Sequence, residues 1–408
     1  MEIQICAHLK TKKWQLISVS FYKYGISEHN SLGAKYNIEI INLSIQIVSQ
    51  TKDYFISSDL LTYALKNCGQ ATKNATTIES ISEHAMTLLK DYAIDLLRMS
   101  NQDIDDFNNN PMEFINKMKD VTRTFYSGRH SALEMVLLIC SIRDPKTDNF
   151  VFLREFFEFC VKSLGECSND FKRKDALLLV IQSLSMLIKT CPTYHKDTEK
   201  VLFEYTMPGL RSEVGLERYR ALKMYFEYSY FEFDQEHLMS IAEQVYNLIK
   251  DPEVPVKVTA AGSLYKLLKK PDLKSIFKPQ LKSILETYFV LMNEIESEDL
   301  VSALEEVVSI FSAEIEPFAV ELCEKLVMSY WRMMQAEEED EDDFGENGLG
   351  AMSCITTIRK IFDSVKTKPE LLKSLEQMCF KLFLNCTTPD GLESIDDMMA
   401  CEIMMMYH

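Results

Sequence analysis

One stretch of the sequence decides the fold: Leu248-Ile249-Lys250-Asp251-Pro252-Glu253-Val254-Pro255-Val256-Lys257-Val258-Thr259-Ala260-Ala261-Gly262-Ser263-Leu264. It reads as the end of one helix, a tight Asp-Pro turn, and a second helix with small residues on its inner face. Small residues let neighbouring helices approach closely. The stretch therefore indicates two helices joined as a hairpin and packed against other helices.

A helical hairpin of this shape, about 40 residues long, is typical of a HEAT repeat, which cannot bury its own apolar face and must stack on neighbours. The starts of further first helices recur along the chain, near Pro111, Asn149, His195, Asp234, Leu273, Glu314 and Lys368. Their spacings are 38, 46, 39, 39, 41 and 54 residues, and a period near 40 is in the HEAT or armadillo range. We therefore predict an all-α fold, an armadillo-like HEAT-repeat solenoid that forms a right-handed superhelix.

The second helix of each unit carries small or apolar residues at i, i+3, i+4 and i+7. A basic residue often lies near its first turn, as in Arg129, Lys174, Arg220 and Lys257. In HEAT arrays such residues commonly reach an acid of an adjacent turn and form a ladder along the stack. Solvation of a surface charge is the alternative, and we weigh the two equally for any single position.

Residues 1–110 are less regular than residues 111–408. Within them Lys12 to Tyr24, Asn37 to Ser49, Phe55 to Lys66 and Ile78 to Met99 have helical patterns, whereas residues 100–110 form a polar break that predicts an extended loop. Helical hairpins continue on both sides of this break. We therefore expect one continuous solenoid rather than two domains.

Composition favours helices joined by short loops and a protein partner. The chain has 12 Gly and 11 Pro in 408 residues, below average usage of about 7% and 5%, and sheet proteins need more turn residues. Its formal charge is −18, which disfavours direct contact with nucleic acid and favours basic proteins.

The sequence has no evident signal peptide, and its longest apolar runs are too short to span a membrane. It contains 11 Cys but no CxxC motif. Reduced, buried thiols in the cytosol or nucleus are the simplest account. We expect no membrane partner.

An acidic insertion accounts for the longest repeat spacing. It holds eight acids in ten residues: Glu337, Glu338, Glu339, Asp340, Glu341, Asp342, Asp343 and Glu346. Like charges at this density resist helix closure, so we predict a mobile loop over residues 337–350. The functional interpretation is an electrostatic arm for a basic partner; a solvated loop without a partner is the alternative.

No constellation for catalysis is present. The seven His residues are scattered, and HExxH, GxSxG, P-loop and G-x-G-x-x-G motifs are absent. We expect no enzyme activity, no metal and no cofactor. The aromatic run from Tyr225 to Phe233 fits a helix packed on both neighbours better than it fits a peptide groove, which stays a weaker alternative.

Several collinear segments resemble one family. Lys12-Lys13-Trp14 with Tyr22-Lys23-Tyr24-Gly25 is similar to that family's "KKW…ERYG", and Asn110-Pro111-Met112-Glu113-Phe114-Ile115 to its "DPYEYI". Arg173-Lys174-Asp175-Ala176-Leu177 resembles "RKKDGAL", and Val254-Pro255-Val256-Lys257-Val258 with Ala260-Ala261 resembles "ELPVKVEAA". The acidic insertion also has its counterpart there. The family is the importin-β superfamily of nuclear transport receptors, in its importin seven/eight branch.

The resemblance implies a nuclear import receptor, or its central arch, that carries basic cargo such as ribosomal proteins or histones. It implies contact with Ran-GTP, weak binding of Phe-Gly nucleoporins, and residence in the cytoplasm, the nucleus and the nuclear envelope or pore. Family members are longer, and we expect this chain to begin partway along such a superhelix and to stop before its C-terminal repeats. No N-terminal Ran-contact motif is therefore carried over. A non-transport HEAT scaffold and an exportin are the alternatives.

Overall fold

The computed structural model describes residues 31–119, 127–167, 170–295, 298–339 and 346–388, with isolated positions 396, 398–399 and 401. The chain divides into two compact units, Met1–Tyr228 and Ser229–His408. Within the described ranges the regular structure is helical, and β pairing is limited to a bridge between Arg143 and Phe150. The all-α prediction is confirmed. The expected change of regularity at residue 110 falls inside the first unit, and one continuous solenoid stays a prediction.

The stretch that decided the fold forms the predicted hairpin in the second unit. Helix α15 (Gln235–Leu248) ends where expected, and α16 (Val254–Leu268) begins after the turn. The Asp251 carboxylate holds this turn by accepting a hydrogen bond from the backbone N–H of Glu253 at 2.9 Å. Pro255 lies in the first turn of α16, where its missing N–H leaves no intrahelical hydrogen bond unmade. Local turn chemistry thus fixes the hairpin.

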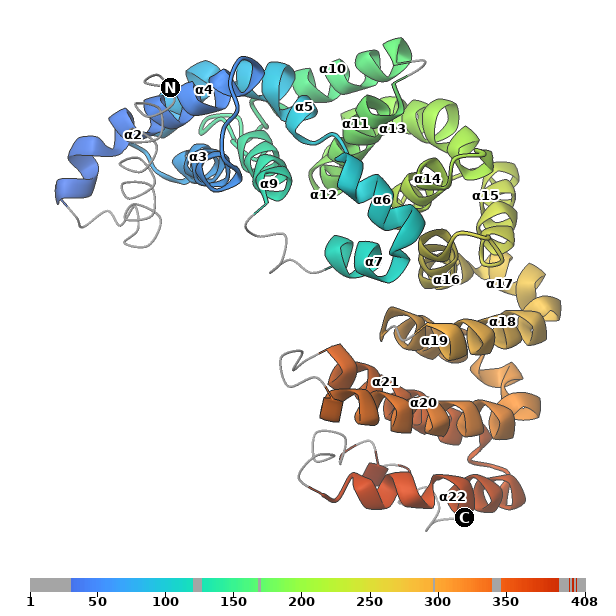
Figure 1. Ribbon diagram of the computed structural model, residues 1–408. Helices are drawn as coiled ribbons and strands as arrows, with labels where there is room; N and C mark the ends of the chain where they lie inside the picture. Colours follow the sequence, from blue (N-terminus) through green and yellow to red (C-terminus); the bar gives the residue numbers. More distant parts are fainter. Residues whose placement is uncertain are drawn as a thin grey trace. The chain divides into compact units, whose positions relative to one another are not determined.

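The first unit contains these described helices (Figure 1). They are α2 (Ser31–Ser49), α3 (Ser58–Gln70), α4 (Ile78–Thr87), α5 (Ile94–Leu96), α6 (Asn101–Asn109), α7 (Pro111–Lys119), α9 (Gly128–Cys140), α10 (Leu153–Glu166), α11 (Phe171–Ser183), α12 (Ser185–Lys189), α13 (His195–Lys200) and α14 (Gly215–Glu227). Two π-helical turns, Leu88–Ala93 and Val201–Thr206, extend α4 and α13. The second helices α3, α9, α11 and α14 pack on one another in that order.

The second unit continues with α15 and α16. Its remaining described helices are α17 (Pro271–Phe277), α18 (Leu281–Glu294), α19 (Glu298–Ile310), α20 (Ala319–Glu339), α21 (Glu346–Val365) and α22 (Pro369–Asn385). Here α16, α19 and α21 are the second helices, and each packs on the next. Both units therefore have the stacked hairpins of a HEAT-repeat fold.

The predicted loop at residues 100–110 is wrong, because it contains helix α6. Ser100 and Asp103 form a reciprocal capping box: the Ser100 hydroxyl accepts from the Asp103 N–H at 3.0 Å, and the Asp103 carboxylate accepts from the Ser100 N–H at 2.9 Å. Phe107, about one helical turn after Asp103, is buried. A capped start and a buried aromatic outweigh the low helix propensity of Asn and Asp.

The predicted repeat start at Pro111 is also wrong in part. A helix begins there, but α7 pairs with α6 rather than with α9. The first helix of this repeat is instead α4 with its π turn and α5. The α6–α7 hairpin therefore interrupts a repeat between its first and second helices. The other predicted starts fall within a few residues of a helix start, as at His195 and at Asp234, which caps α15.

Substitutions at two adjacent positions of α16 should change the stability of the chain in opposite directions. Ala261 is fully buried, whereas a Cβ added at Gly262 would meet no atom within 4 Å. We expect Ala261→Leu to lower the free energy of unfolding by about 1–3 kcal/mol through overpacking. Gly262→Ala should raise it by about 0.5–1 kcal/mol, because helical Gly is entropically costly. Urea unfolding of both variants checks this, and equal effects would contradict the packing described for α16.

Candidate protein-binding surfaces

The predicted acidic arm is only partly helix-free. Helix α20 runs to Glu339 and α21 begins at Glu346, so the loop expected at residues 337–350 is wrong for residues 337–339 and 346–350, and residues 340–345 lie outside the described residues. Packing explains the difference, because α20 lies against α21 along its length and Tyr330 and Met333 are buried. The side chains of all eight acids lie outside the described residues, and their role stays a prediction.

The predicted ladder is present in the first unit. Arg129 of α9 contacts Asp175 of α11 at 3.3 Å, and Arg220 of α14 contacts the same carboxylate at 2.6 Å. Lys174 lies 3.7 Å from Glu217. One carboxylate therefore joins three consecutive second helices, and the side chains of Arg220 and Asp175 are 5% and 7% exposed.

The ladder continues within the second unit. Lys257 of α16 lies 3.3 Å from Glu294 of α18, which favours the ladder over solvation at this position. Lys360 of α21 contacts Glu305 of α19 at 2.8 Å. These pairs are more exposed than Asp175 and Arg220, so each contributes at most about 1 kcal/mol. Each one joins neighbouring repeats.

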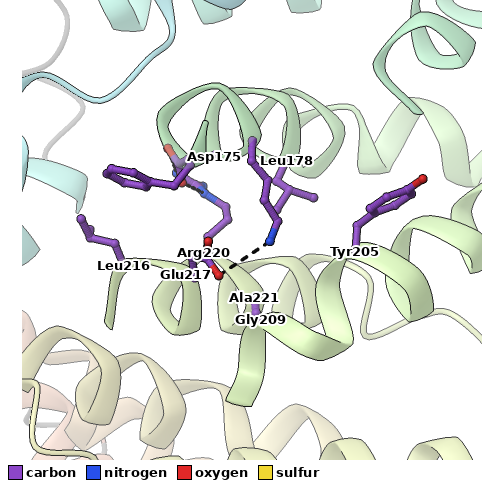
Figure 2. A pocket seen from close by; sticks show the side chains of 10 residues that line it. Asp175, Leu178, Tyr205, Gly209, Leu216, Glu217, Arg220 and Ala221 are labelled. Carbon is purple, nitrogen blue, oxygen red and sulfur yellow. Dashed lines mark hydrogen bonds and ion pairs between the residues drawn. The ribbon is translucent and has the colours of Figure 1, made fainter. Parts of the chain in front are cut away.

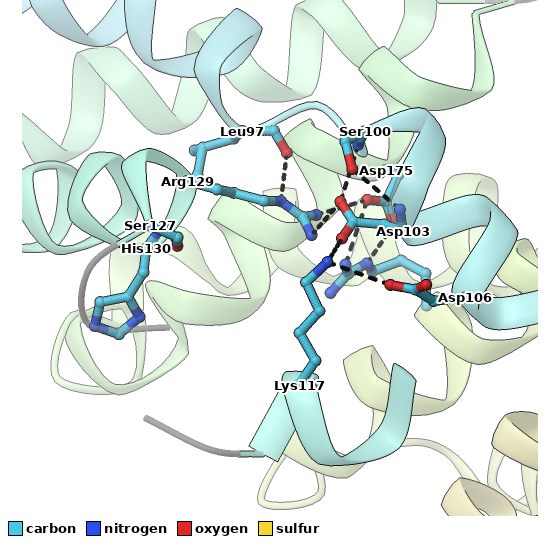
Figure 3. A network of polar contacts seen from close by, with 10 residues as sticks. Leu97, Ser100, Asp103, Asp106, Lys117, Ser127, Arg129, His130 and Asp175 are labelled. Carbon is cyan, nitrogen blue, oxygen red and sulfur yellow. Dashed lines mark hydrogen bonds and ion pairs between the residues drawn. The ribbon is translucent and has the colours of Figure 1, made fainter. Parts of the chain in front are cut away.

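A polar network that the sequence did not reveal surrounds the hairpin of α6 and α7, residues 101–119, which we call the strap (Figure 3). Lys117 of α7 donates to Asp103 at 2.5 Å and lies 3.5 Å from Asp106, so the two helices of the strap are joined by charge. Arg129 of α9 approaches Asp103 at 3.9 Å and donates to the carbonyl of Leu97 at 3.0 Å. Both aspartates are buried.

The network keeps the Asp103 carboxylate charged. Burial alone raises the pKa of Asp103, but hydrogen bonds from Lys117 and Ser100 outweigh burial and hold the pKa below its usual value. Burial lowers the pKa of Lys117, yet Asp103 and Asp106 raise it overall. A buried carboxylate that stays ionised needs its cationic partners, so the strap is bound to them.

Aromatic rings attach the strap to α14. Phe107 and Phe114 meet edge to face, with ring centroids 5.1 Å apart. Both also lie edge to face against Tyr219 of α14, at 6.4 and 5.2 Å. Lys172 of α11 donates to the side chain of Asn101 at 2.6 Å. The strap therefore touches α9, α11 and α14.

A cavity beside the ladder is too small for a ligand. Figure 2 shows it between α11 and α14, and its lining includes Asp175 and Arg220 of the ladder. Its volume is about 10 Å³, roughly the space of one water. Gly209 closes one side, where an added Cβ would lie 3.1 Å from the Cβ of Ala221. This part of the stack is packed rather than hollow.

The aromatic run contributes to packing where α14 ends. Tyr225 and Tyr228 are buried, and their hydroxyls donate to the carbonyls of Leu202 and Ile181 at 2.7 and 2.8 Å. Burial raises the pKa of Tyr225. This agrees with the packed-helix interpretation for these two residues.

An apolar row lies on the first helices of the second unit. Arg332 of α20 donates to the carbonyl of Met292 at 2.9 Å, and Asn385 of α22 donates to the hydroxyl of Tyr330 at 2.8 Å. These contacts place α18, α20 and α22 side by side. The exposed apolar side chains on these helices, which we call the apolar row, are Val290, Met328, Phe380 and Leu384. Val290 also lines a groove of about 300 Å³ with Ile249 and Leu291, whose other lining residues are polar or charged.

No metal site or membrane helix is found in the described part of the chain. No group of three His, Cys, Asp or Glu residues there could hold a metal ion. No described helix is long and apolar enough to cross a membrane.

Curated relatives of this chain are named as importins. A probable importin-7 homolog of Dictyostelium discoideum is 24% identical over 98% of this chain and 39% of its own length. An importin beta-like SAD2 homolog of Arabidopsis thaliana is 25% identical over 85% of this chain and 34% of its own length. Importin-8 of Mus musculus is 24% identical over 91% and 38%.

The fold agrees with a solved transport receptor. The structure of the exportin Cse1 in its cargo-free, cytoplasmic state matches 90% of this chain and 41% of that chain, with a TM-score of 0.65 and 16% identity. This match shows the fold. The similarity to the importin relatives supports a place in the importin-β superfamily, in its importin-7/8 branch.

The chain spans only part of the length of its relatives. It covers about 39% of the Dictyostelium relative and 34% of the Arabidopsis one. No family model matches it. The similarity therefore concerns a segment of a longer solenoid in those relatives.

We expect the contribution of Asp103 in the strap to the free energy of unfolding to depend on pH. Asp103→Asn should lower the free energy of unfolding by roughly 1.5–3 kcal/mol at pH 7, because Lys117 and Arg129 lose a charged acceptor. Since the pKa of Asp103 is lower in the folded state, its stabilisation is full above the unfolded value of about 4 and is lost as pH falls through the folded value.

Urea unfolding of the wild type and the variant at pH 7 and pH 3 measures this effect, and the gap between them should narrow in acid. Asp105→Asn is the matched control, because Asp105 is exposed on the same helix and accepts a local hydrogen bond from Asn109. Equal losses in the two variants would contradict the role given to Asp103.

Proposed function

We propose that the chain is a nuclear import receptor, or the central cargo-binding arch of one, and that it carries basic proteins through the nuclear pore under control of the Ran GTPase. The observation that carries the proposal is similarity along 85–98% of the chain to proteins named as importins in distant organisms. The stacked hairpins supply extended helical surfaces, which suit protein recognition rather than catalysis.

Charge supports basic cargo. The chain carries −18, and the acidic segment supplies 8 of these charges within ten residues. Such a segment attracts positive proteins at long range and loses strength with added salt. Ribosomal proteins and histones have the required charge. In this proposal Glu337, Glu338, Glu339, Asp340, Glu341, Asp342, Asp343 and Glu346 cover the positive patch of the cargo.

The apolar row supports nucleoporin binding. A Phe-Gly repeat offers one aromatic ring on a flexible chain, and a shallow apolar groove can take that ring weakly. The groove at Val290 has the volume for it, and Val290 is its exposed apolar residue among mostly polar and charged lining residues. Binding there agrees with residence in the cytoplasm, the nucleus and the nuclear pore.

Two alternatives make different predictions. The match to the exportin Cse1 favours an export receptor as the second candidate. Export cargo binds more tightly in the presence of Ran-GTP, whereas import cargo is released by it. A HEAT scaffold without a transport role would ignore both Ran and nucleoporin repeats.

The direct test is a pull-down of purified basic ribosomal proteins on this chain, with and without Ran locked in its GTP form. We expect cargo to bind and then to be displaced by Ran-GTP. Tighter binding with Ran-GTP would assign export. Cargo binding that does not respond to Ran would reduce the chain to a cargo-binding arch or a scaffold.

Neutralising the acidic segment tests the cargo site. Replacement of the seven acids from Glu337 to Asp343 by Ser should weaken binding of a basic cargo at least tenfold at low salt and flatten its salt dependence. Titration by fluorescence anisotropy at several salt concentrations measures both effects.

The matched control removes the same net charge elsewhere. It replaces seven exposed acids of the second unit by Ser: Glu236, Glu243, Asp272, Glu321, Glu324, Glu370 and Glu376. Equal weakening in both variants would mean that cargo senses only total charge, and the acidic segment would lose its assigned role.

A single apolar substitution tests the nucleoporin groove. Val290→Ser should weaken binding of a Phe-Gly repeat peptide at least threefold, because the ring loses apolar contact. Val151→Ser, at a similarly exposed position in the first unit, should leave binding unchanged. NMR titration of the labelled peptide measures the affinities, and unchanged binding to Val290→Ser would exclude this groove.

A further inference from the structure

The strap contacts helices that are two repeats apart. Through Asp103 it meets Arg129 of α9, and through Phe107 and Phe114 it meets Tyr219 of α14. Helix α11 lies between them and is held from the same side by Lys172, which donates to Asn101. A rotation of α14 against α9 would therefore have to break contacts with the strap as well as with α11.

The ion pairs beneath the strap reinforce this link. The Asp175 carboxylate of α11 forms ion pairs with both Arg129 and Arg220, and Arg220 also donates to Gln182 at 2.7 Å. These groups are largely buried, so separating them would leave charges without water or partners. These contacts therefore oppose rotation of the three second helices α9, α11 and α14 against one another.

The described second unit has no comparable element. Its cross-repeat ion pairs, such as Lys257 with Glu294 and Lys360 with Glu305, each join adjacent repeats. Between α16 and α21, which are also two repeats apart, α19 is the intervening contact. In a solenoid small rotations per repeat add up when only neighbours touch.

We propose that the strap is a brace, which fixes the rotation of α9, α11 and α14 against one another and leaves the repeats of the second unit free to change their rotation. The first unit then presents a constant surface to a partner. Changes of curvature on partner binding are concentrated in the second unit. The brace follows from the contacts of the strap alone and does not depend on the transport role.

Pulsed EPR on the full chain tests the brace. Spin labels are placed at Ser141→Cys and Lys223→Cys, at the end of α9 and on α14, and at Lys266→Cys and Asp363→Cys, on α16 and α21. Each pair spans two repeats. The more accessible native cysteines Cys167 and Cys191, and Cys6, are replaced by Ser.

We expect a narrow distance distribution for the first pair and one at least twice as broad for the second. Replacement of residues 101–119 by a Gly-Ser linker of equal length removes the strap and should broaden the first distribution to the width of the second. If this variant does not fold, Phe114→Ser releases the strap from Tyr219 with a smaller change. Lys257→Met, which breaks one neighbouring pair in the second unit, is the control and should leave the first distribution unchanged.

Two results would overturn the brace. One is a first distribution that stays narrow without the strap, because stacking alone would then fix the rotation. The other is an equally narrow distance distribution for the second label pair in the wild type, because repeats without a strap would then be as rigid as repeats with one.

Discussion

A helical hairpin cannot cover its own apolar side, and every other feature of this chain depends on that constraint. Small buried residues, such as Ala260 and Ala261, let each second helix approach the next. Turn chemistry sets where each hairpin closes, as the Asp251 carboxylate does before α16. The surfaces left over are long and continuous, so recognition of extended protein partners is the natural use of the fold.

Buried charge adds specificity to this packing. Asp175 serves two arginines from different helices, and a slip of either helix would leave a buried charge unpaired. Such groups contribute less to net stability than their Coulomb attraction suggests, since burial removes their hydration. We infer that they select one register of α9, α11 and α14 over others. The more exposed lysine–glutamate pairs of the second unit do not constrain their helices in this way.

The sequence predicted the repeating hairpin, and offered the ladder as one of two alternatives, because both depend on short patterns. The Asp-Pro turn and the small residues of α16 lie within one hairpin. The basic residue at the first turn of a second helix needs only one contact with a neighbouring repeat. Helix α6 of the strap was missed because its residues, rich in Asn and Asp, resemble a loop until their partners are known. Ser100 followed by Asp103 is a capping signal, and with the apolar Phe107 it could have indicated a helix. That α6 and α7 lie across other repeats depends on Tyr219 and Arg129, which no local pattern reveals.

The strap also bears on how the chain reaches its folded state. Most contacts between repeats join residues about 40 positions apart, as Lys257 and Glu294 do, and short loops close quickly. The contact between Phe107 and Tyr219 closes a loop of more than 100 residues and needs α9, α11 and α14 already in place. Loop-closure entropy therefore places strap docking late, after the stack has formed. A chain emerging from the ribosome would hold Phe107 and Phe114 exposed until α14 has been synthesised, which makes these two rings natural targets for chaperones.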